Sequence, residues 1–135
     1  MNETESIVQG AMFHNASPNA NALVRIKGGI AQIANHQIAY MRYQNHTVVF
    51  HLTTGRDVST TVMRISFSDY VRCYLKDKRF VKSHNAYVVN MDHVQVLGKQ
   101  QFHMMNGGTV PISKRVYVDV KKCFVDYMLG KPEAY

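Results

Sequence analysis

The stretch FVKSHNAYVVN, residues 80–90, decides how this sequence is interpreted. Val81 and residues 87–89 are β-branched or aromatic, which favours a β-strand. Residues 82–86 between them are a lysine, a serine, a histidine, an asparagine and an alanine, a poor filling for a strand that is buried on both faces. Either the stretch is an ordinary polar strand edge, or these side chains are placed to contact a ligand.

Composition indicates one globular domain with a basic surface. The 135 residues are 46% hydrophobic, and the apolar runs are too short for a membrane span or a signal peptide. Lys and Arg number 16 against nine Asp and Glu, which gives a formal net charge of +7 at pH 7. A domain this basic attracts polyanions, most simply nucleic acid or an anionic membrane surface, although excess charge can also serve solubility alone.

The chain divides into an arm, a domain and a short tail. Residues 1–21 are rich in Asn, Ala and Ser and show no sustained apolar period, so we expect a flexible arm or linker. The folded domain is expected at residues 22–130 and a tail at 131–135. Cys73 and Cys123 have neither metal nor disulfide spacing, and we expect reduced, half-buried thiols of a cytoplasmic protein.

Short extended segments dominate the expected domain. Gly28-Gly29 and Asn106–Gly108 supply the positive φ of tight hairpin turns, and Pro111 favours an edge strand. The extended segments are expected at residues 22–26, 30–33, 38–43, 46–53, 57–65, 80–90, 93–97, 101–105 and 109–113.

Two helices complete the predicted fold. One inserted helix is expected from Ser66 to about Lys76, because Ser66 and Asp69 resemble a capping box and apolar residues recur at helical spacing. A second is expected at the C-terminal end of the domain, where Gly130 and Pro132 end it. The fold class is therefore mostly β, with one inserted and one C-terminal helix.

The sequence carries no motif that is typical of an enzyme or a metal site. The seven histidines form no HxxxH pair and no CxxC-type cluster. No glycine-rich phosphate loop or GxSxG elbow is present, and neither cysteine has an evident base beside it in sequence. We therefore expect no enzymatic activity and no metal or cofactor.

Polar and basic side chains instead gather at the expected turn tips. Nucleic-acid recognition needs cations for phosphates and planar polar groups for base edges, and His46, Asn85 and Arg115 could meet the second need. Taken singly, each has an ordinary explanation as a surface residue, and His84 and Asn90 are better explained by structural hydrogen bonds. Lysines that could serve phosphates lie on or near the same turns: Lys82, Lys99 and Lys114.

Two motifs supply the shared pattern that single residues lack. RFVKSHNAYVVNMDHVQVL at residues 79–97 and NGGTVPISKR at residues 106–115 closely resemble the LytTR DNA-binding domain of bacterial transcription regulators. The core of that family reads roughly F-x-[RK]-x-H-[RN]-S-[YF]-x-V-N, followed by an apolar strand, a glycine turn and a P-[IV]-S-R-[RK]-like close. The resemblance spans about residues 22–129.

The resemblance implies an elongated stack of short antiparallel sheets, about ten strands in all, with small helices packed against it. Loops of such domains enter successive major grooves, and the stretch between them meets the intervening backbone and minor groove. His46 and Arg115 are similar to the major-groove positions, and Asn85 to the contact between them, so base contacts are expected at these three residues. DNA backbone contacts are expected at six further residues: Lys82, Ser83, His84, Lys99, Ser113 and Lys114.

Three positions depart from the family pattern. Ala86 stands where the family usually has Ser, which removes a hydroxyl that could contact phosphate. Asn85 stands where many members carry Arg, so base preference could differ there. Lys114 replaces a frequent Arg, which keeps the charge but loses the planar fork.

The sequence therefore predicts sequence-specific binding of double-stranded DNA in transcription regulation. The domain would be the output domain of a bacterial two-component response regulator, or a stand-alone regulator, with no receiver domain in this chain. Paired direct repeats are the expected target, a homodimer on DNA is left open, and no membrane contact is expected. The alternatives are a basic β module that docks an acidic protein partner and, ranked last, a nonspecific single-strand binder, which would need exposed aromatic residues.

Overall fold

The computed structural model describes residues 20–131, and within them ten strands form three antiparallel sheets, which confirms the predicted fold class. The predicted arm and tail fall almost wholly on residues 1–19 and 132–135, outside the described residues. The strands are, in chain order, β1 (Asn21–Ile26), β2 (Gly29–Ala34), β3 (Ile38–Gln44), β4 (Thr47–Leu52), β5 (Asp57–Ser59), β6 (Phe80–His84), β7 (Tyr87–Asn90), β8 (Val94–Leu97), β9 (Gln101–Met104) and β10 (Thr109–Pro111).

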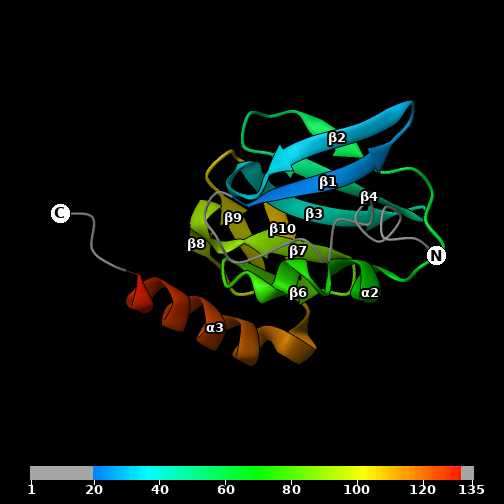
Figure 1. Ribbon diagram of the computed structural model, residues 1–135. Helices are drawn as coiled ribbons and strands as arrows, with labels where there is room; N and C mark the ends of the chain where they lie inside the picture. Colours follow the sequence, from blue (N-terminus) through cyan, green and yellow to red (C-terminus); the bar gives the residue numbers. More distant parts are fainter. Residues whose placement is uncertain (1–19, 132–135) are drawn as a thin grey trace.

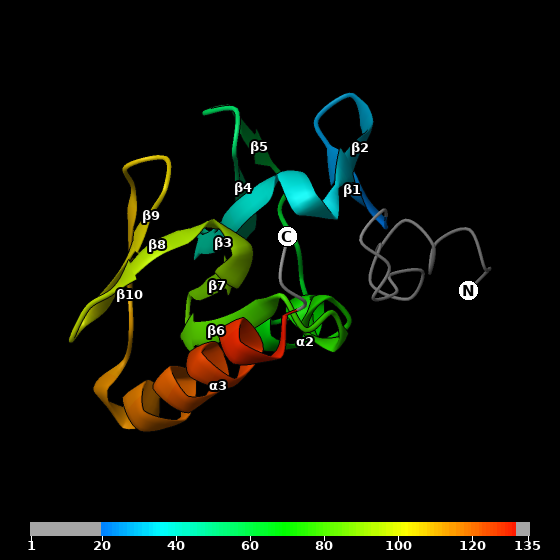
Figure 2. The ribbon, with the colours of Figure 1, turned by 90° about the vertical axis from the view of Figure 1, so that its left-hand side faces the viewer.

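A five-stranded sheet in the order β5-β4-β3-β7-β6 forms the centre of the domain (Figure 1). The β1–β2 hairpin and the short helix α2 (Phe67–Val71) cover one face of this sheet and form the first core with it. The sheet β10-β9-β8 and the helix α3 (Tyr117–Gly130) cover the other face and form the second core (Figure 2). No helix in the described range is both long and apolar enough to cross a membrane.

Side chains that alternate along the central strands contribute to both hydrophobic cores. Met41 and Val88 belong to the first core, whereas Ala39 and Val89 belong to the second. Successive side chains of a strand point to opposite faces, and both faces are covered here, so Val88 and Val89 are both fully buried. This explains the continuous apolar run that closes the motif at residues 80–90.

The stretch 80–90 is a hairpin and not the single strand that its composition predicted. β6 and β7 pair antiparallel, the turn lies at Asn85-Ala86, and the register shifts between Lys82 and His84. That prediction is wrong because the polar residues in the middle are themselves the end of β6 and the turn. The fold thus places both apolar halves in the central sheet, with the turn at the end of the two strands.

The glycine and proline signals are confirmed. Gly28 has φ +85° in the β1–β2 turn and Gly107 has φ +95° in the β9–β10 turn, a backbone conformation that L side chains rarely adopt. Pro111 lies in β10, which is an edge strand of its sheet. An edge position suits proline because it has no backbone N–H to donate.

The inserted helix is shorter than predicted. Its start is confirmed, because the hydroxyl of Ser66 accepts the backbone N–H of Asp69 at 3.1 Å. After Val71 the chain leaves the α-helix and makes a 3-10 turn, η3 (Tyr74–Lys76), before it enters β6. This turn carries the fully buried Tyr74 into the first core, where its ring lies 6.0 Å from that of Phe50.

The predicted strand 57–65 is regular only over β5. Beyond it the chain crosses from β4 to the β1–β2 hairpin, so it cannot continue one ladder. Thr60 exchanges hydrogen bonds with Val48 of β4, and the N–H of Thr61 donates to the carbonyl of Arg25 in β1 at 3.0 Å. The crossing therefore fixes residues 60–63 beside the start of β4.

Two polar groups hold the second half of the domain together. The fully buried amide of Asn90 donates to the carbonyl of Ile38 at 2.9 Å and accepts the N–H of Asp92, which confirms its predicted structural role. Asp92 in turn accepts hydrogen bonds from Tyr127 and Lys131 at the end of α3. Burial alone would raise the pKa of Asp92, but the hydrogen bonds from Lys131 and Tyr127, together with the charges of Lys131 and Arg79, outweigh it and lower the pKa below its ordinary value.

The two cysteines differ in exposure. Cys73 is half-buried, as predicted, whereas Cys123 on α3 is exposed, so that prediction is wrong for Cys123. The apolar face of α3 packs through Val120, which is buried, and Phe124, whose ring lies 5.7 Å from Phe102. Three short 3-10 turns complete the described elements: η2 (Asn35–Gln37), η4 (Met91–His93) and η5 (Lys114–Val116).

Candidate nucleic-acid interface

Two of the predicted contact residues lie on neighbouring turns of the central sheet. β3 runs antiparallel to both β4 and β7, so the β3–β4 turn and the β6–β7 turn come to the same end of the sheet. The backbone joins them directly, because the N–H of Tyr43 donates to the carbonyl of Ala86 at 2.8 Å. His46 and Asn85 are therefore carried on adjacent turns.

The segment that links β10 to α3 lies beside the β6–β7 hairpin. The hydroxyl of Ser83 donates to the carbonyl of Pro111 at 2.9 Å, and the N–H of Ser113 donates to the carbonyl of Ser83 at 2.8 Å. On the other side of this link, the N–H of Ile112 donates to the carbonyl of Gln100 at 2.7 Å, which places the β8–β9 turn beside it.

Four segments thus follow one another along one edge of the domain. We call them the loop row: residues 44–47, 84–87, 111–115 and 98–101, in spatial order. None of the four contains an Asp or Glu, although the chain has nine of them. Lys99, Lys114 and Arg115 are exposed in the row, so its segments carry positive charge and no carboxylate of their own.

His46 occupies a constrained backbone position at the first turn. Asn45 and His46 have φ of 52° and 62°, a left-handed conformation that is uncommon for residues other than glycine. The hydroxyl of Tyr43 lies 3.2 Å from Nδ1 of His46, and the two rings meet edge to face. His46 is exposed, so its other ring nitrogen, Nε2, is free to meet a ligand.

The second turn presents an asparagine and orients a histidine. Asn85 is exposed at the tip. The N–H of Ala86 donates to Nδ1 of His84 at 3.1 Å, which confirms the predicted structural hydrogen bond. Because a backbone N–H can only donate, Nδ1 must be the acceptor, and the neutral ring carries its hydrogen on Nε2.

The remaining predicted cations lie on or beside the row. Lys114 and Arg115 form the exposed start of η5, and Lys99 is exposed on the β8–β9 turn. Lys82 is half-buried in β6, and its ammonium donates to the hydroxyl of Ser68 at 3.1 Å. Lys82 thus lies toward α2, at the margin of the row.

Ser83 is not accessible to DNA, which a contact with the DNA backbone would require. The whole residue is buried, and its hydroxyl and carbonyl both hold the β10–α3 link in place. We therefore correct its predicted backbone contact to a structural role. Ser113 is half-buried, and its N–H donates to the carbonyl of Ser83. Its hydroxyl is therefore the group that could reach a phosphate.

One further segment beside His46 was not predicted. The N–H of Met63 donates to the carbonyl of His46 at 2.8 Å, which places the exposed Arg64 next to the first turn. Tyr43 was also missed as a partner of His46. No local pattern marks either residue, because both contacts depend on how β3, β4 and the crossing segment meet in space.

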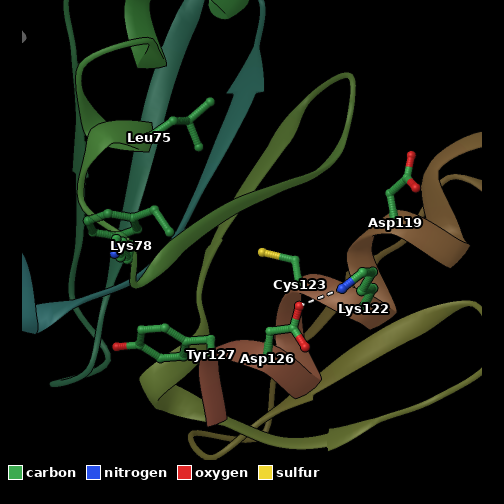
Figure 3. A pocket seen from close by; sticks show the side chains of 8 residues that line it. Leu75, Lys78, Asp119, Lys122, Cys123, Asp126 and Tyr127 are labelled. Carbon is green, nitrogen blue, oxygen red and sulfur yellow. Dashed lines mark hydrogen bonds and ion pairs between the residues drawn. The ribbon is translucent and has the colours of Figure 1, made fainter. Parts of the chain in front are cut away.

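A groove between η3, β6 and α3 is the other notable surface (Figure 3). It has a volume of about 590 Å³ and lies outside the loop row. Its charges are mixed: Lys122 pairs with Asp126 at 2.8 Å, and Lys78 and Asp119 also line it. Among residues 20–131, no group of three or more His, Cys, Asp or Glu side chains could hold a metal ion.

Comparisons with known proteins agree with this architecture. The sequence model of the LytTr DNA-binding domain matches residues 28–124. A solved LytTr DNA-binding domain from Bacillus cereus superposes with a TM-score of 0.59 at 16% sequence identity, covering 82% of this chain and 97% of that one. At this identity the structural likeness shows a shared fold. No curated protein matches the chain.

Proposed function

The chain belongs to the LytTR family of DNA-binding domains, and from this membership we propose that it binds double-stranded DNA sequence-specifically to regulate transcription. One observation carries the proposal. His46, Asn85 and Arg115, chosen from the sequence, are exposed on adjacent segments of one basic edge that lacks carboxylates.

The order of the segments suits a protein that reads two grooves. Residues 44–47 and 111–115 flank the turn at 84–87, so the outer two can enter successive major grooves while the middle one faces the backbone and minor groove between them. Arg115 can donate two hydrogen bonds to O6 and N7 of a guanine, and His46 can donate one from its ring. Asn85 would contact bases from the intervening position.

Backbone contacts would fix the register of the domain on the duplex. Lys99 and Lys114 are exposed and can meet phosphates directly, and His84 can donate from Nε2. Lys82 would exchange its bond with Ser68 for a phosphate oxygen. The hydroxyl of Ser113 completes the proposed set. Each cation that neutralises a phosphate makes the affinity more sensitive to salt.

We further propose a setting for this activity. The domain would work in the bacterial cytoplasm, as the output domain of a two-component response regulator or as a stand-alone regulator. Paired direct repeats would bring two copies side by side on DNA, and contacts between those copies would form only there. No membrane contact is part of this proposal.

A selection from random duplex DNA at physiological salt tests the function. Wild type, His46→Ala/Arg115→Ala and Lys122→Ala are run side by side; Lys122 lies on α3 outside the loop row and serves as the matched control. We expect wild type and the control to enrich the same repeated motif and the double variant to enrich none. Binding without any enriched motif would favour the basic module that docks an acidic protein.

A further inference from the structure

We propose that Tyr43 is a positioning residue that keeps Nε2 of His46 a hydrogen-bond donor, and thereby selects base edges that present an acceptor. The inference rests on the proposed function, in which His46 contacts a base. It starts from one contact, the 3.2 Å approach of the Tyr43 hydroxyl to Nδ1 of His46. That contact goes beyond the prediction that His46 simply stands exposed on a turn.

Tyr43 is held firmly enough to orient a neighbour. Its ring packs against the first core and lies 5.7 Å from the ring of Phe67 on α2. Its backbone N–H is fixed by the carbonyl of Ala86. The hydroxyl therefore projects from a packed ring on a central strand, whereas the imidazole that it meets stands on an exposed turn.

The turn itself also has little freedom. The carbonyl of His46 accepts the N–H of Met63 at 2.8 Å, and the hydroxyl of Thr47 donates to the carbonyl of Gln44 at 2.7 Å. With both backbone and ring held, His46 presents Nε2 outward from a defined place. A side chain that is already ordered loses less conformational entropy when it binds.

The chemistry of the pair then fixes the hydrogen on the ring. A phenolic hydroxyl is a better donor than acceptor, so Tyr43 donates to Nδ1 and the neutral imidazole carries its hydrogen on Nε2. Protonation of the ring adds a hydrogen at Nδ1, which then donates to the Tyr43 oxygen. Nε2 is an N–H donor in both charge states.

A donor that never becomes an acceptor discriminates between base edges. In the major groove guanine presents two acceptors, O6 and N7, while adenine presents N7 and thymine O4, whereas the amino group of cytosine only donates. We therefore expect an acceptor edge, with guanine favoured, opposite His46. Nε2 of His84 is a donor for a parallel reason, since the N–H of Ala86 occupies its Nδ1.

Nitrogen NMR of the free domain and a DNA selection test this together. The variant is Tyr43→Phe, which keeps the ring against Phe67 and removes the hydroxyl. The control is Tyr127→Phe, which also removes a hydroxyl hydrogen bond, to Asp92, but at the far end of α3. His46→Gln identifies the His46 signals.

In wild type and in Tyr127→Phe we expect His46 to be wholly Nε2-protonated when neutral. In Tyr43→Phe we expect a mixture of tautomers, a loss of about three- to tenfold in affinity for the selected site, and a relaxed preference at one base position. A wild-type ring protonated on Nδ1, or a variant that keeps the single tautomer, would overturn the positioning role.

The two proposals fail separately. If wild type enriches no DNA motif, the proposed function and the base preference fall, while the NMR spectra of the free domain still decide whether Tyr43 sets the tautomer. If wild type enriches a motif and Tyr43→Phe enriches it with the same base preference, the function stands and the selective role of Tyr43 is wrong.

Discussion

The loop row and the groove along α3 both carry lysines, but they differ in where the carboxylates lie. In the groove Lys122 pairs with Asp126, and Asp119 lies nearby (Figure 3). In the row, none of Lys99, Lys114 and Arg115 forms an ion pair within the part of the chain that the structure describes. The absence of acidic residues, more than the presence of basic ones, therefore distinguishes the proposed DNA-binding edge.

The largest effect is expected when a carboxylate is placed in the loop row. Asn85→Asp changes one atom on an exposed tip at the centre of the edge. We expect DNA affinity to fall by about 3 kcal/mol, because the new charge would face phosphates and the amide donor would be lost. Fluorescence anisotropy with the selected duplex measures the change.

Asn106→Asp is the matched control for that experiment. Asn106 is also exposed on a turn, and its side-chain oxygen accepts the N–H of Gly108, a role that Asp can keep. It lies on the β9–β10 turn, at the opposite end of β9 from the row. Equal losses in the two variants would mean that net charge alone governs binding and that the row has no special place.

The second prediction separates base reading from general attraction. Arg115→Ala should cost about 1–3 kcal/mol with the selected duplex and relax the preference at one base position, because a two-point contact to guanine is lost. Binding to a scrambled duplex should change much less. Lys122→Ala, about two turns further along α3, should leave both affinities nearly unchanged. Similar losses in both variants would reduce the edge to one part of a diffuse basic surface.

The fold could be predicted from the sequence wherever local rules decide it. Gly28, Gly107 and Pro111 marked turns and an edge strand because their backbone preferences act at the residue itself. The motif at residues 80–90 was misjudged as one strand. Composition shows that its middle is polar, but it does not show that the chain reverses there.

The site could be predicted only in part, for the same reason. The exposed tips of His46, Asn85 and Arg115 followed from sequence position and family pattern. Ser83 was assigned to DNA although it is buried, because its partner, Pro111, lies 28 residues further along the chain. Contacts of that range depend on how the sheets pack, and no local period encodes them.

A third prediction examines the end of α3, where carboxylates support structure. Asp92→Asn should lower the free energy of unfolding by about 1 kcal/mol at pH 7, because the bonds from Tyr127 and Lys131 would lose their charged acceptor. The folded pKa of Asp92 is lowered, so its contribution is present above the ordinary value of 3.8 and is lost as the pH falls below it. Urea unfolding at pH 7 and pH 3 checks this.

The Asp92→Asn variant should lower the stability of the domain without changing its affinity for DNA. Asp92→Asn should bind the selected duplex as wild type does, since Asp92 lies outside the loop row. Its deficit in stability should shrink at pH 3, because the carboxyl of the unfolded chain, at its ordinary pKa of 3.8, is then largely protonated while the folded pKa is lower. A deficit that stays constant between the two pH values would show that packing, and not the charge of Asp92, is what the end of α3 needs.

The smallest expected effect is also the most specific to electrostatics. Lys99→Ala removes an exposed cation from the last segment of the row, where a lysine can meet phosphate but has no planar fork for a base. The affinity at physiological salt should fall less than about tenfold and equally for selected and scrambled duplexes, because phosphates carry no sequence information. The slope of log affinity against log salt should become shallower by about 0.9, the share of one phosphate contact. An unchanged slope would mean that Lys99 does not contact DNA and that the contact surface stops at residues 111–115. A change in base preference would instead mean that the β8–β9 turn enters a groove.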